Sequence, residues 1–385
     1  MAKREIRFGL IGGGLMGKEF ASAAARWCHL YDLDFEPRIV ALSSITLADL
    51  EWFQCQVNGL ELATQDYREL LARDDIEAIY CAVPHDLHEQ IYCDTLRAGK
   101  HLLGEKPFGI DQAANAAILA AIGEHPDLLV RCSSEFPYFP GAYRIGRWAR
   151  ESRFGKIIEV ESGLWHSSDL DPRKPINWKR RIATCGEYGC LGDLGMHVVH
   201  LPFRLGWTPA DVRALLSKII TERPGKDGAP VPCETWDNAI LATRVETADQ
   251  SFPMILSTKR IAPGHANTWF IRIVGTALSA EFSTRFPKQL TYLPYTPGDE
   301  QAWRVLDVPH TPPYKSITGH IFEFGFSDGL IQMFAAFCDE LVNGRDGMSQ
   351  PLYCATPQET AASHALFTAA LESQRTGATV RMLVA

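Results

Sequence analysis

The chain has 385 residues, of which 46% are hydrophobic and 22% charged, and its formal net charge is −8 at pH 7. This length and composition are typical of a globular protein with two domains. The negative charge argues against nucleic acid or an anionic membrane as a partner, because both favour clusters of Lys and Arg.

Cysteine spacing and the N-terminal pattern bear on localisation. The ten cysteines are scattered without a CxxC pair or a zinc-binding spacing, and the N-terminus runs straight into a strand pattern. No apolar stretch has the length that a bilayer span needs. We therefore expect a reduced, cytoplasmic protein that holds no metal and does not cross a membrane.

A glycine-rich turn, GLIGGGLMG, follows the first predicted strand. Gly12, Gly14 and Gly17 have the spacing G-x-G-x-x-G, which allows a tight turn and a close approach of the backbone to a pyrophosphate. The helix that begins at Leu15 and Met16 would direct its free N–H groups at the phosphates. The turn predicts a dinucleotide site, and a plain structural turn is the alternative.

The second predicted strand, PRIVALSS, ends at Ser43 and Ser44. Dinucleotide folds that prefer NAD usually place an acidic residue at this point, where it binds the adenosine ribose. Neither an acidic residue nor an adjacent Arg is present. We expect the serines to lie near the ribose, with NAD as the cofactor and NADP not excluded.

Alternating strands and helices continue over residues 75–110. This alternation predicts a parallel sheet with helices on both faces, in which ligands bind beyond the carboxyl ends of the strands. Glu105 and Lys106 follow one such strand, and Pro84 to His88 form the turn after another. We expect these residues at the cofactor site, with Glu105 in a supporting role.

The segment GCLGDLGMHVVH places Asp193 and His197 four residues apart. On a helix their side chains share one face, one turn apart. A carboxylate and an imidazole in an apolar setting either satisfy each other structurally or handle protons. Asp193 capping a helix is the other simple alternative.

Three motifs follow one another along the chain. They are the glycine turn, the EKP that contains Lys106, and the D-x-G-x-H from Asp193 to His197. With this order the chain resembles the Gfo/Idh/MocA family of nicotinamide-dependent oxidoreductases. The resemblance implies that Lys106 contacts the nicotinamide ribose and the substrate hydroxyl. It also implies that Asp193 and His197 flank the reacting carbon, with His197 or Lys106 exchanging the hydroxyl proton.

From about residue 131 strand-like runs separated by turns replace the α/β alternation, which indicates a mostly antiparallel sheet. We expect a Rossmann domain over 1–130 and a substrate-binding and oligomerisation α+β domain with a large open sheet over 131–354. A final helix at about 355–375 is expected to return to the Rossmann domain. The resemblance implies a homodimer or homotetramer that pairs through the open sheet face.

A Pro-rich loop with a basic run lies just before the D-x-G-x-H motif. One or two of its cations would bind an anionic group on the substrate, and an ordinary solvated face is the alternative. Nearby aromatic side chains would supply flat surfaces for a sugar ring. The candidate substrate-binding residues are Trp165, His166, Trp178, Lys179, Arg180, Arg181, Tyr188 and His200.

Two functions fit these features. The first is a dehydrogenase that oxidises a secondary hydroxyl of a sugar, a polyol or a sugar derivative with NAD(P). The alternative is an NAD-dependent glycosidase that oxidises, eliminates, hydrates and reduces again, acting on an anionic glycoside. Tyr188 and His200 are candidates for removing its carbon-bound proton, and His200 stands where family members often carry Asp.

Overall fold

The computed structural model describes residues 3–382. The chain forms two compact units, each built from two segments. Unit 1 comprises Met1–Tyr138 and Thr311–Pro357, and unit 2 comprises Phe139–His310 and Gln358–Ala385. The first boundary therefore falls after Tyr138, a few residues beyond the predicted 130.

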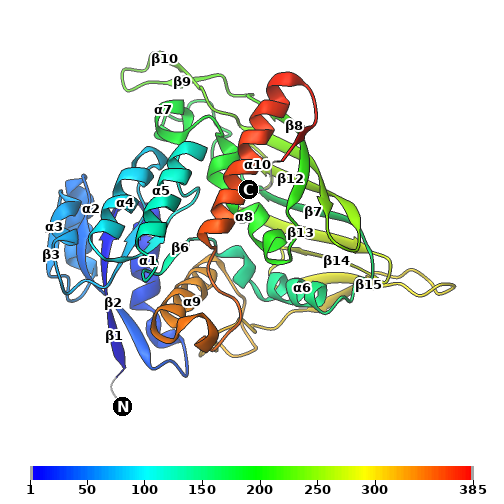
Figure 1. The fold of residues 1–385 in the computed structure, drawn as a ribbon, viewed down its shortest axis with the longest axis horizontal. Coiled ribbons are helices and arrows are strands. Elements are labelled where there is room, and N and C mark those ends of the chain that lie inside the picture. The colour runs from blue at the N-terminus through cyan, green and yellow to red at the C-terminus, as the bar shows by residue number, and fades with distance from the viewer. Residues whose placement is uncertain (1–2, 383–385) are drawn as a thin grey trace. The chain divides into compact units, whose positions relative to one another are not determined.

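Unit 1 contains, within the described residues, a six-stranded parallel sheet with the order β3-β2-β1-β4-β5-β6 (Figure 1). Its strands are β1 (Arg4–Ile11), β2 (Phe35–Ser43), β3 (Leu62–Thr64), β4 (Ala78–Cys81), β5 (His101–Gly104) and β6 (Val130–Cys132). The strand order reverses between β1 and β4, which is where α/β sheets bind ligands. The predicted Rossmann fold is confirmed.

Helices cover both faces of this sheet. They are α1 (Leu15–Ala25), α2 (Leu47–Gln56), α3 (Tyr67–Leu71), α4 (His88–Arg97) and α5 (Gln112–Glu124). Phe8 of β1 packs on Phe20 of α1 with ring centres 5.6 Å apart. A Cβ on the next residue, Gly9, would lie 3.3 Å from Leu70 of α3. Because adjacent strand residues point to opposite faces, α1 and α3 lie on opposite sides of the sheet.

A late helix, α9 (Phe326–Gly347), completes unit 1. Its Phe334 is fully buried, and the ring centre lies 5.0 Å from that of Phe8 and 4.1 Å from that of Phe20. The helix that returns to the Rossmann unit is thus α9, whereas the prediction gave this role to a helix at about residues 355–375. The apolar spacing of both C-terminal helices marks a buried face, but it does not specify the partner that each helix packs on.

The final helix, α10 (Pro357–Thr376), belongs to unit 2 instead. Ser373 and Gln374 accept hydrogen bonds from the backbone N–H groups of Ala214 (3.0 Å) and Leu216 (2.8 Å). Both donors lie on β8 (Pro209–Ser217), so the helix is tied directly to the sheet of its own unit.

Unit 2 holds, over the described range, a nine-stranded sheet with the order β16-β15-β14-β13-β7-β12-β11-β8-β17. Neighbouring strands run antiparallel except β7 and β12, which are parallel. The further strands are β7 (Ile157–Trp165), β11 (Asn238–Glu246), β12 (Ser251–Lys259), β13 (Thr268–Gly275), β14 (Leu278–Ser283), β15 (Gln289–Pro294), β16 (Arg304–Asp307) and β17 (Val380–Arg381). The predicted large, mostly antiparallel sheet is confirmed.

One face of this sheet is covered by α8 (Cys190–Arg204). Ser162 of β7 donates a hydrogen bond to the carbonyl of Val198 (2.9 Å), and Trp269 of β13 donates one to the carbonyl of His197 (2.9 Å). Other elements of the unit are α6 (Pro140–Arg150), α7 (Ile182–Cys185) and the hairpin of β9 (Glu222–Pro224) and β10 (Pro230–Pro232).

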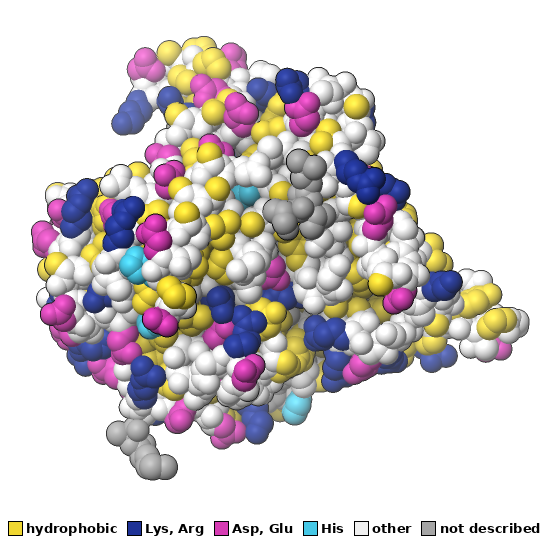
Figure 2. Space-filling model, in the orientation of Figure 1, with side chains coloured by type: hydrophobic (Ala, Val, Ile, Leu, Met, Phe, Trp, Pro, Cys, Tyr) yellow, Lys and Arg dark blue, Asp and Glu magenta, His cyan; other side chains and the backbone are white. Residues whose placement is uncertain are grey.

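The surface carries charges of both signs. On the face drawn in Figure 2, Lys and Arg side chains are interspersed with Asp and Glu, without a broad basic stripe. In the part of the chain that the structure describes, no helix is long and apolar enough to cross a membrane.

We expect Phe334→Ala to lower the free energy of unfolding of unit 1 by about 3–5 kcal/mol, because it opens a cavity between α9 and the sheet. Urea denaturation followed by circular dichroism measures this loss. Phe322→Ala, at a side chain that is 61% exposed, is the matched control and should change stability little. Equal effects of the two substitutions would contradict the placement of α9.

Candidate functional site

The glycine turn of unit 1 has the geometry of a phosphate-binding loop. Gly12 has a φ of 102°, and a Cβ there would lie 2.4 Å from the carbonyl oxygen of Ala82. A Cβ on Gly17 would lie 2.2 Å from the carbonyl oxygen of Gly12, so helix α1 packs against the turn only with glycine there. Both positions therefore require glycine for steric reasons.

Gly14, the N-cap of α1, leaves the start of the helix open. Apart from Gly14 itself and its chain neighbours, no described residue has an atom within 4 Å of the position of its Cβ, and no side chain of the described residues caps the helix. Leu15, 76% exposed, and Met16 begin the first turn. Uncapped N–H groups at a helix start attract an anion such as a pyrophosphate. These residues therefore fit a dinucleotide.

The end of β2 lies beside this turn. The backbone N–H of Gly12 donates to the carbonyl of Ser43 (2.9 Å), and the Ser44 hydroxyl donates to Oδ2 of Asp49 (3.4 Å). Asp49 lies in the first turn of α2, and Nζ of Lys18 is 2.8 Å from its Oδ1. Asp49 is absent from the predicted site residues, because an acidic ribose ligand is expected at the strand end and Asp49 lies in the following helix.

His88 supports the turn after β4. Its ring is fully buried and stacks on Tyr92, with centres 4.8 Å apart. Nδ1 accepts a hydrogen bond from the N–H of Gly109 (3.3 Å), and Nε2 lies 3.1 Å from the carbonyl of Val83. Both ring nitrogens thus hold backbone groups, and the imidazole stabilises the turn at Pro84.

Two buried carboxyl groups lie near Lys106. Glu105 accepts a hydrogen bond from the hydroxyl of Tyr80 (2.7 Å). Glu135 is 2% exposed, and its burial, together with the nearby charge of Glu105, raises its pKa to about 8, an effect that Lys106 opposes. At pH 7 the Glu135 carboxyl therefore keeps its proton and adds no negative charge next to Lys106. Glu135 is a second residue that sequence reasoning missed.

In unit 2 the D-x-G-x-H motif lies on α8 near its N-terminus. The helix follows Gly189, whose φ of 56° and close approach to the N–H of Trp236 (2.6 Å from a Cβ) exclude larger residues. Asp193 is 1% exposed and His197 is 6% exposed. A Cβ on Gly195 would lie 2.5 Å from the Phe367 ring of α10, so this glycine lets the two helices pack closely.

Asp193 is held by two cations. Nζ of Lys179 lies 3.0 Å from both carboxylate oxygens, and Nη2 of Arg260 lies 3.1 Å from Oδ2. Arg260 is fully buried and also donates to the carbonyls of Lys179 (3.1 Å) and Gly189 (3.4 Å). Two cations and several hydrogen bonds offset the cost of removing this carboxylate from water.

Arg260 escaped the sequence analysis because it stands next to Lys259 at the end of an apolar strand run. Adjacent residues of a strand point to opposite faces, so a basic pair there places one cation on each side of the sheet. That alternation is the signal that would have found it.

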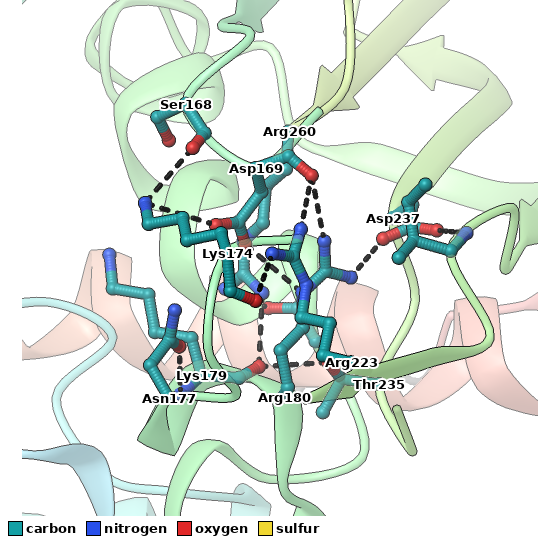
Figure 3. Close-up of polar contacts among 12 residues, drawn as sticks. Ser168, Asp169, Lys174, Asn177, Lys179, Arg180, Arg223, Thr235, Asp237 and Arg260 are labelled. Atoms are coloured by element: carbon teal, nitrogen blue, oxygen red, sulfur yellow. Dashed lines mark hydrogen bonds and ion pairs between the residues drawn. The ribbon is translucent and has the colours of Figure 1, made fainter. Parts of the chain in front are cut away.

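The basic run of the predicted substrate loop divides in the structure. Arg180 is fully buried, pairs with Asp237 and places Nε 3.1 Å from Oδ2 of Asp169. Arg223 lies beside it and donates to the carbonyls of Asp169 (2.5 Å) and Lys174 (3.0 Å) (Figure 3). The charge of Arg180 is therefore used inside unit 2, in contrast to the prediction that it contacts substrate.

Trp178 precedes Lys179 and Arg180 in the chain, and Arg181 follows them. Arg181 is exposed, and Lys179 alone of the three basic residues lies at Asp193. Nζ of Lys179 also lies 5.5 Å from the centre of the Trp178 ring. The side chains of Trp178 and Lys179 thus lie together beside the carboxylate.

Two neighbouring residues at the end of β7 lie on opposite sides of the sheet. Trp165 packs on Phe270 with ring centres 5.0 Å apart and donates to the hydroxyl of Ser257 (2.8 Å), on the face away from α8. The structure therefore does not bring Trp165 to Asp193. The charge of Asp193 acts on His166, but burial has the larger effect and lowers the pKa of His166 to about 4, so this imidazole is neutral at pH 7.

Tyr188 and His200 lie in the interior of unit 2. Tyr188 is 3% exposed, and its hydroxyl lies 2.7 Å from Oγ1 of Thr368 on α10. His200 is fully buried on α8. Both side chains are buried to the same degree as Asp193 and His197, and their contact with substrate stays a prediction. Within residues 3–382, no group of three His, Cys, Asp or Glu side chains could hold a metal ion.

Comparisons with known proteins agree with this fold. Residues 6–130 match the family described as "Oxidoreductase family, NAD-binding Rossmann fold" (GFO_IDH_MocA). Inositol 2-dehydrogenase of Rhizobium meliloti is 27% identical over 263 residues, which cover 68% of this chain and 71% of that protein.

Levoglucosan dehydrogenase of Pseudarthrobacter phenanthrenivorans is 27% identical over 228 residues, 58% of this chain and 57% of that protein, so the match spans little more than half of this relative. A solved structure of levoglucosan dehydrogenase in complex with NADH superposes with a TM-score of 0.87 at 22% identity, and it covers 99% of this chain and 100% of that one. Residues 6–130 therefore match the NAD-binding Rossmann domain of the Gfo/Idh/MocA oxidoreductases, and the chain as a whole shares the fold of the levoglucosan dehydrogenase structure.

Proposed function

We propose that this protein is an NAD(P)-dependent oxidoreductase that oxidises a secondary hydroxyl of a sugar or polyol. The observation that carries the proposal is the buried carboxylate of Asp193. It lies on the same helix as His197 and is paired with Lys179 and Arg260 from elsewhere in unit 2. It accompanies a glycine turn whose open helix start fits a pyrophosphate. When bound, a nicotinamide coenzyme supplies the hydride acceptor.

The residues of α8 suit the handling of a hydroxyl proton. A secondary alcohol loses a proton as it loses hydride, so a base must lie within about 2.6–3.2 Å of its oxygen. We assign this role to His197. Asp193, one helical turn away, already pairs its negative charge with two cations. The role that the family resemblance implies for Lys106, contact with the substrate hydroxyl, stays a prediction.

A neutral sugar or polyol is the substrate class that we favour. Arg180 is already paired with Asp237, and Lys179 with Asp193. Neither positive charge is therefore left to bind an anionic group on the substrate. Trp178 and His166 offer a flat ring surface and an uncharged imidazole near Asp193. The named relatives act on comparable compounds, levoglucosan and inositol.

A relative named as a glycosyl hydrolase supports the glycosidase alternative. A glycosyl hydrolase family 109 protein of Shewanella amazonensis is 25% identical over 187 residues, which cover 46% of this chain and 39% of that protein. That chemistry needs a further base at a substrate carbon, for which Tyr188 and His200 are the candidates. We prefer the dehydrogenase, because two relatives that match over more of this chain are named as dehydrogenases. Pairing through the open sheet face and a cytoplasmic location stay predictions.

We expect His197→Ala to lower kcat by about 10²–10⁴-fold, because the general base is lost, while the affinity for NADH stays unchanged. The assay follows NADH formation and nitrophenol release together, with a panel of sugars, polyols and nitrophenyl glycosides. His125→Ala, at the C-terminal end of α5, is the control. Nitrophenol release that requires NAD without net reduction would favour the glycosidase instead.

We expect Lys179→Met to lower kcat/KM about tenfold or more, because Asp193 loses one of its two cations, and Lys179→Arg to restore part of the loss. Steady-state kinetics with the best substrate of the panel measures both. Lys174→Met, in the same loop but 3.6 Å from Asp169, should change kcat/KM less than about twofold. A loss in both methionine variants alike would mean that only the folding of the loop was affected.

The raised pKa of Glu135, about 8, predicts a pH-dependent stability. Folded Glu135 keeps its proton up to about pH 8, whereas the unfolded chain releases it near the ordinary Glu value, so stability falls as pH rises between them. We expect the unfolding free energy of Glu135→Gln, measured with urea at pH 5 and pH 9, to fall less than that of the parent protein. Parallel pH profiles would contradict the assignment.

A further inference from the structure

The acidic residue missing from the end of β2 has a spatial substitute on α2. A Cβ added to Gly13 would lie 2.8 Å from Cβ of Asp49 and 3.1 Å from Cβ of Ser44. Asp49 therefore packs directly on the middle of the glycine turn, although it follows the strand end by several residues. We propose that Asp49 binds the adenosine ribose hydroxyls and makes the protein select NAD over NADP. This inference rests on the proposed function.

The hydrogen bonds of Asp49 leave room for the ribose. Nζ of Lys18 lies 2.8 Å from Oδ1, which orients the carboxylate, and Oδ2 accepts only a long bond of 3.4 Å from the Ser44 hydroxyl among the hydrogen bonds of the described residues. The side chain of Asp49 is 18% exposed. A carboxylate accepts about four hydrogen bonds, so its oxygens can accept two more from a vicinal diol.

The local charges disfavour a 2′-phosphate. Such a group brings a charge of about −2 next to the Asp49 carboxylate, and the repulsion acts against NADP. Lys18 is already bound to Asp49, and its ammonium lies 5.3 Å from the ring centre of Trp52. Arg38, the arginine of β2, instead pairs with Glu5 at 3.2 Å. Each of the two cations is thus already paired with a carboxylate.

The surroundings also suit the base of the coenzyme. Ile45, which follows Ser44 directly, is 85% exposed, and Leu47 at the start of α2 is 64% exposed. Large apolar side chains left this open beside a polar ribose site are typical of a surface that packs on an adenine ring. The carboxylate of Asp49 and the apolar side chains of Ile45 and Leu47 are therefore all suited to binding the adenosine moiety of the coenzyme.

The test compares the binding of NADH and NADPH by the full-length protein, using the fluorescence of the reduced nicotinamide and calorimetry. We expect the parent protein to bind NADH more tightly. Asp49→Asn should shift the ratio of the two dissociation constants toward NADPH by about tenfold or more, because only the negative charge is lost. Glu51→Gln removes the same charge from an exposed position of the same helix and should leave the ratio unchanged.

Lys18→Met separates the opposite assignment, because a selective loss of NADPH binding in this variant would make Lys18 a phosphate ligand and overturn the proposal. Equal weakening of both coenzymes by Asp49→Asn, in a variant with a parent-like circular dichroism spectrum, would reduce Asp49 to a structural role and also overturn it. A parent protein that binds neither coenzyme would contradict the proposed function itself. Binding with an unchanged ratio would contradict this inference alone.

Discussion

The ion pairs of Asp193 are the interaction on which unit 2 depends. The carboxylate is 1% exposed, and its two cations come from separate parts of the chain, Lys179 from the irregular loop and Arg260 from just beyond β12. An unpaired charge at this depth would cost several kcal/mol. Helix α8, the end of the interior strand β12 and the loop are therefore tied to one another through a single carboxylate.

The same principle extends outward through the loop before α8. Its residues form little regular structure, and buried charges hold them in place: Arg180 between Asp169 and Asp237, and Arg223 on the carbonyls of Asp169 and Lys174. Fixing this loop by internal charges keeps Lys179 against Asp193. The loop that carries Lys179 is thus ordered by electrostatics rather than by hydrogen-bonded strands.

Unit 1 is organised by steric constraints. Backbone oxygens lie 2.2–2.4 Å from the positions where side chains on Gly12 and Gly17 would begin, so the turn keeps its close packing only with glycine. Next to the strand ends, Glu105 is fixed by Tyr80, while Glu135 stays protonated near neutral pH because burial raises its pKa to about 8. The unit combines a rigid turn with a buried acid whose charge varies with pH.

Local patterns in the sequence predicted the parallel and antiparallel sheets, the glycine turn, and the positions of Lys106, Asp193 and His197, because strand alternation and turn geometry depend on neighbouring residues. Long-range packing settled the rest. Arg180 is buried while its neighbour Arg181 is exposed, and Trp165 and His166 lie on opposite faces of one sheet. Asp49 reaches the glycine turn only through the folding of α2 onto β2, and α9 rather than α10 completes unit 1. These choices depend on partners distant in the chain, which no local spacing encodes.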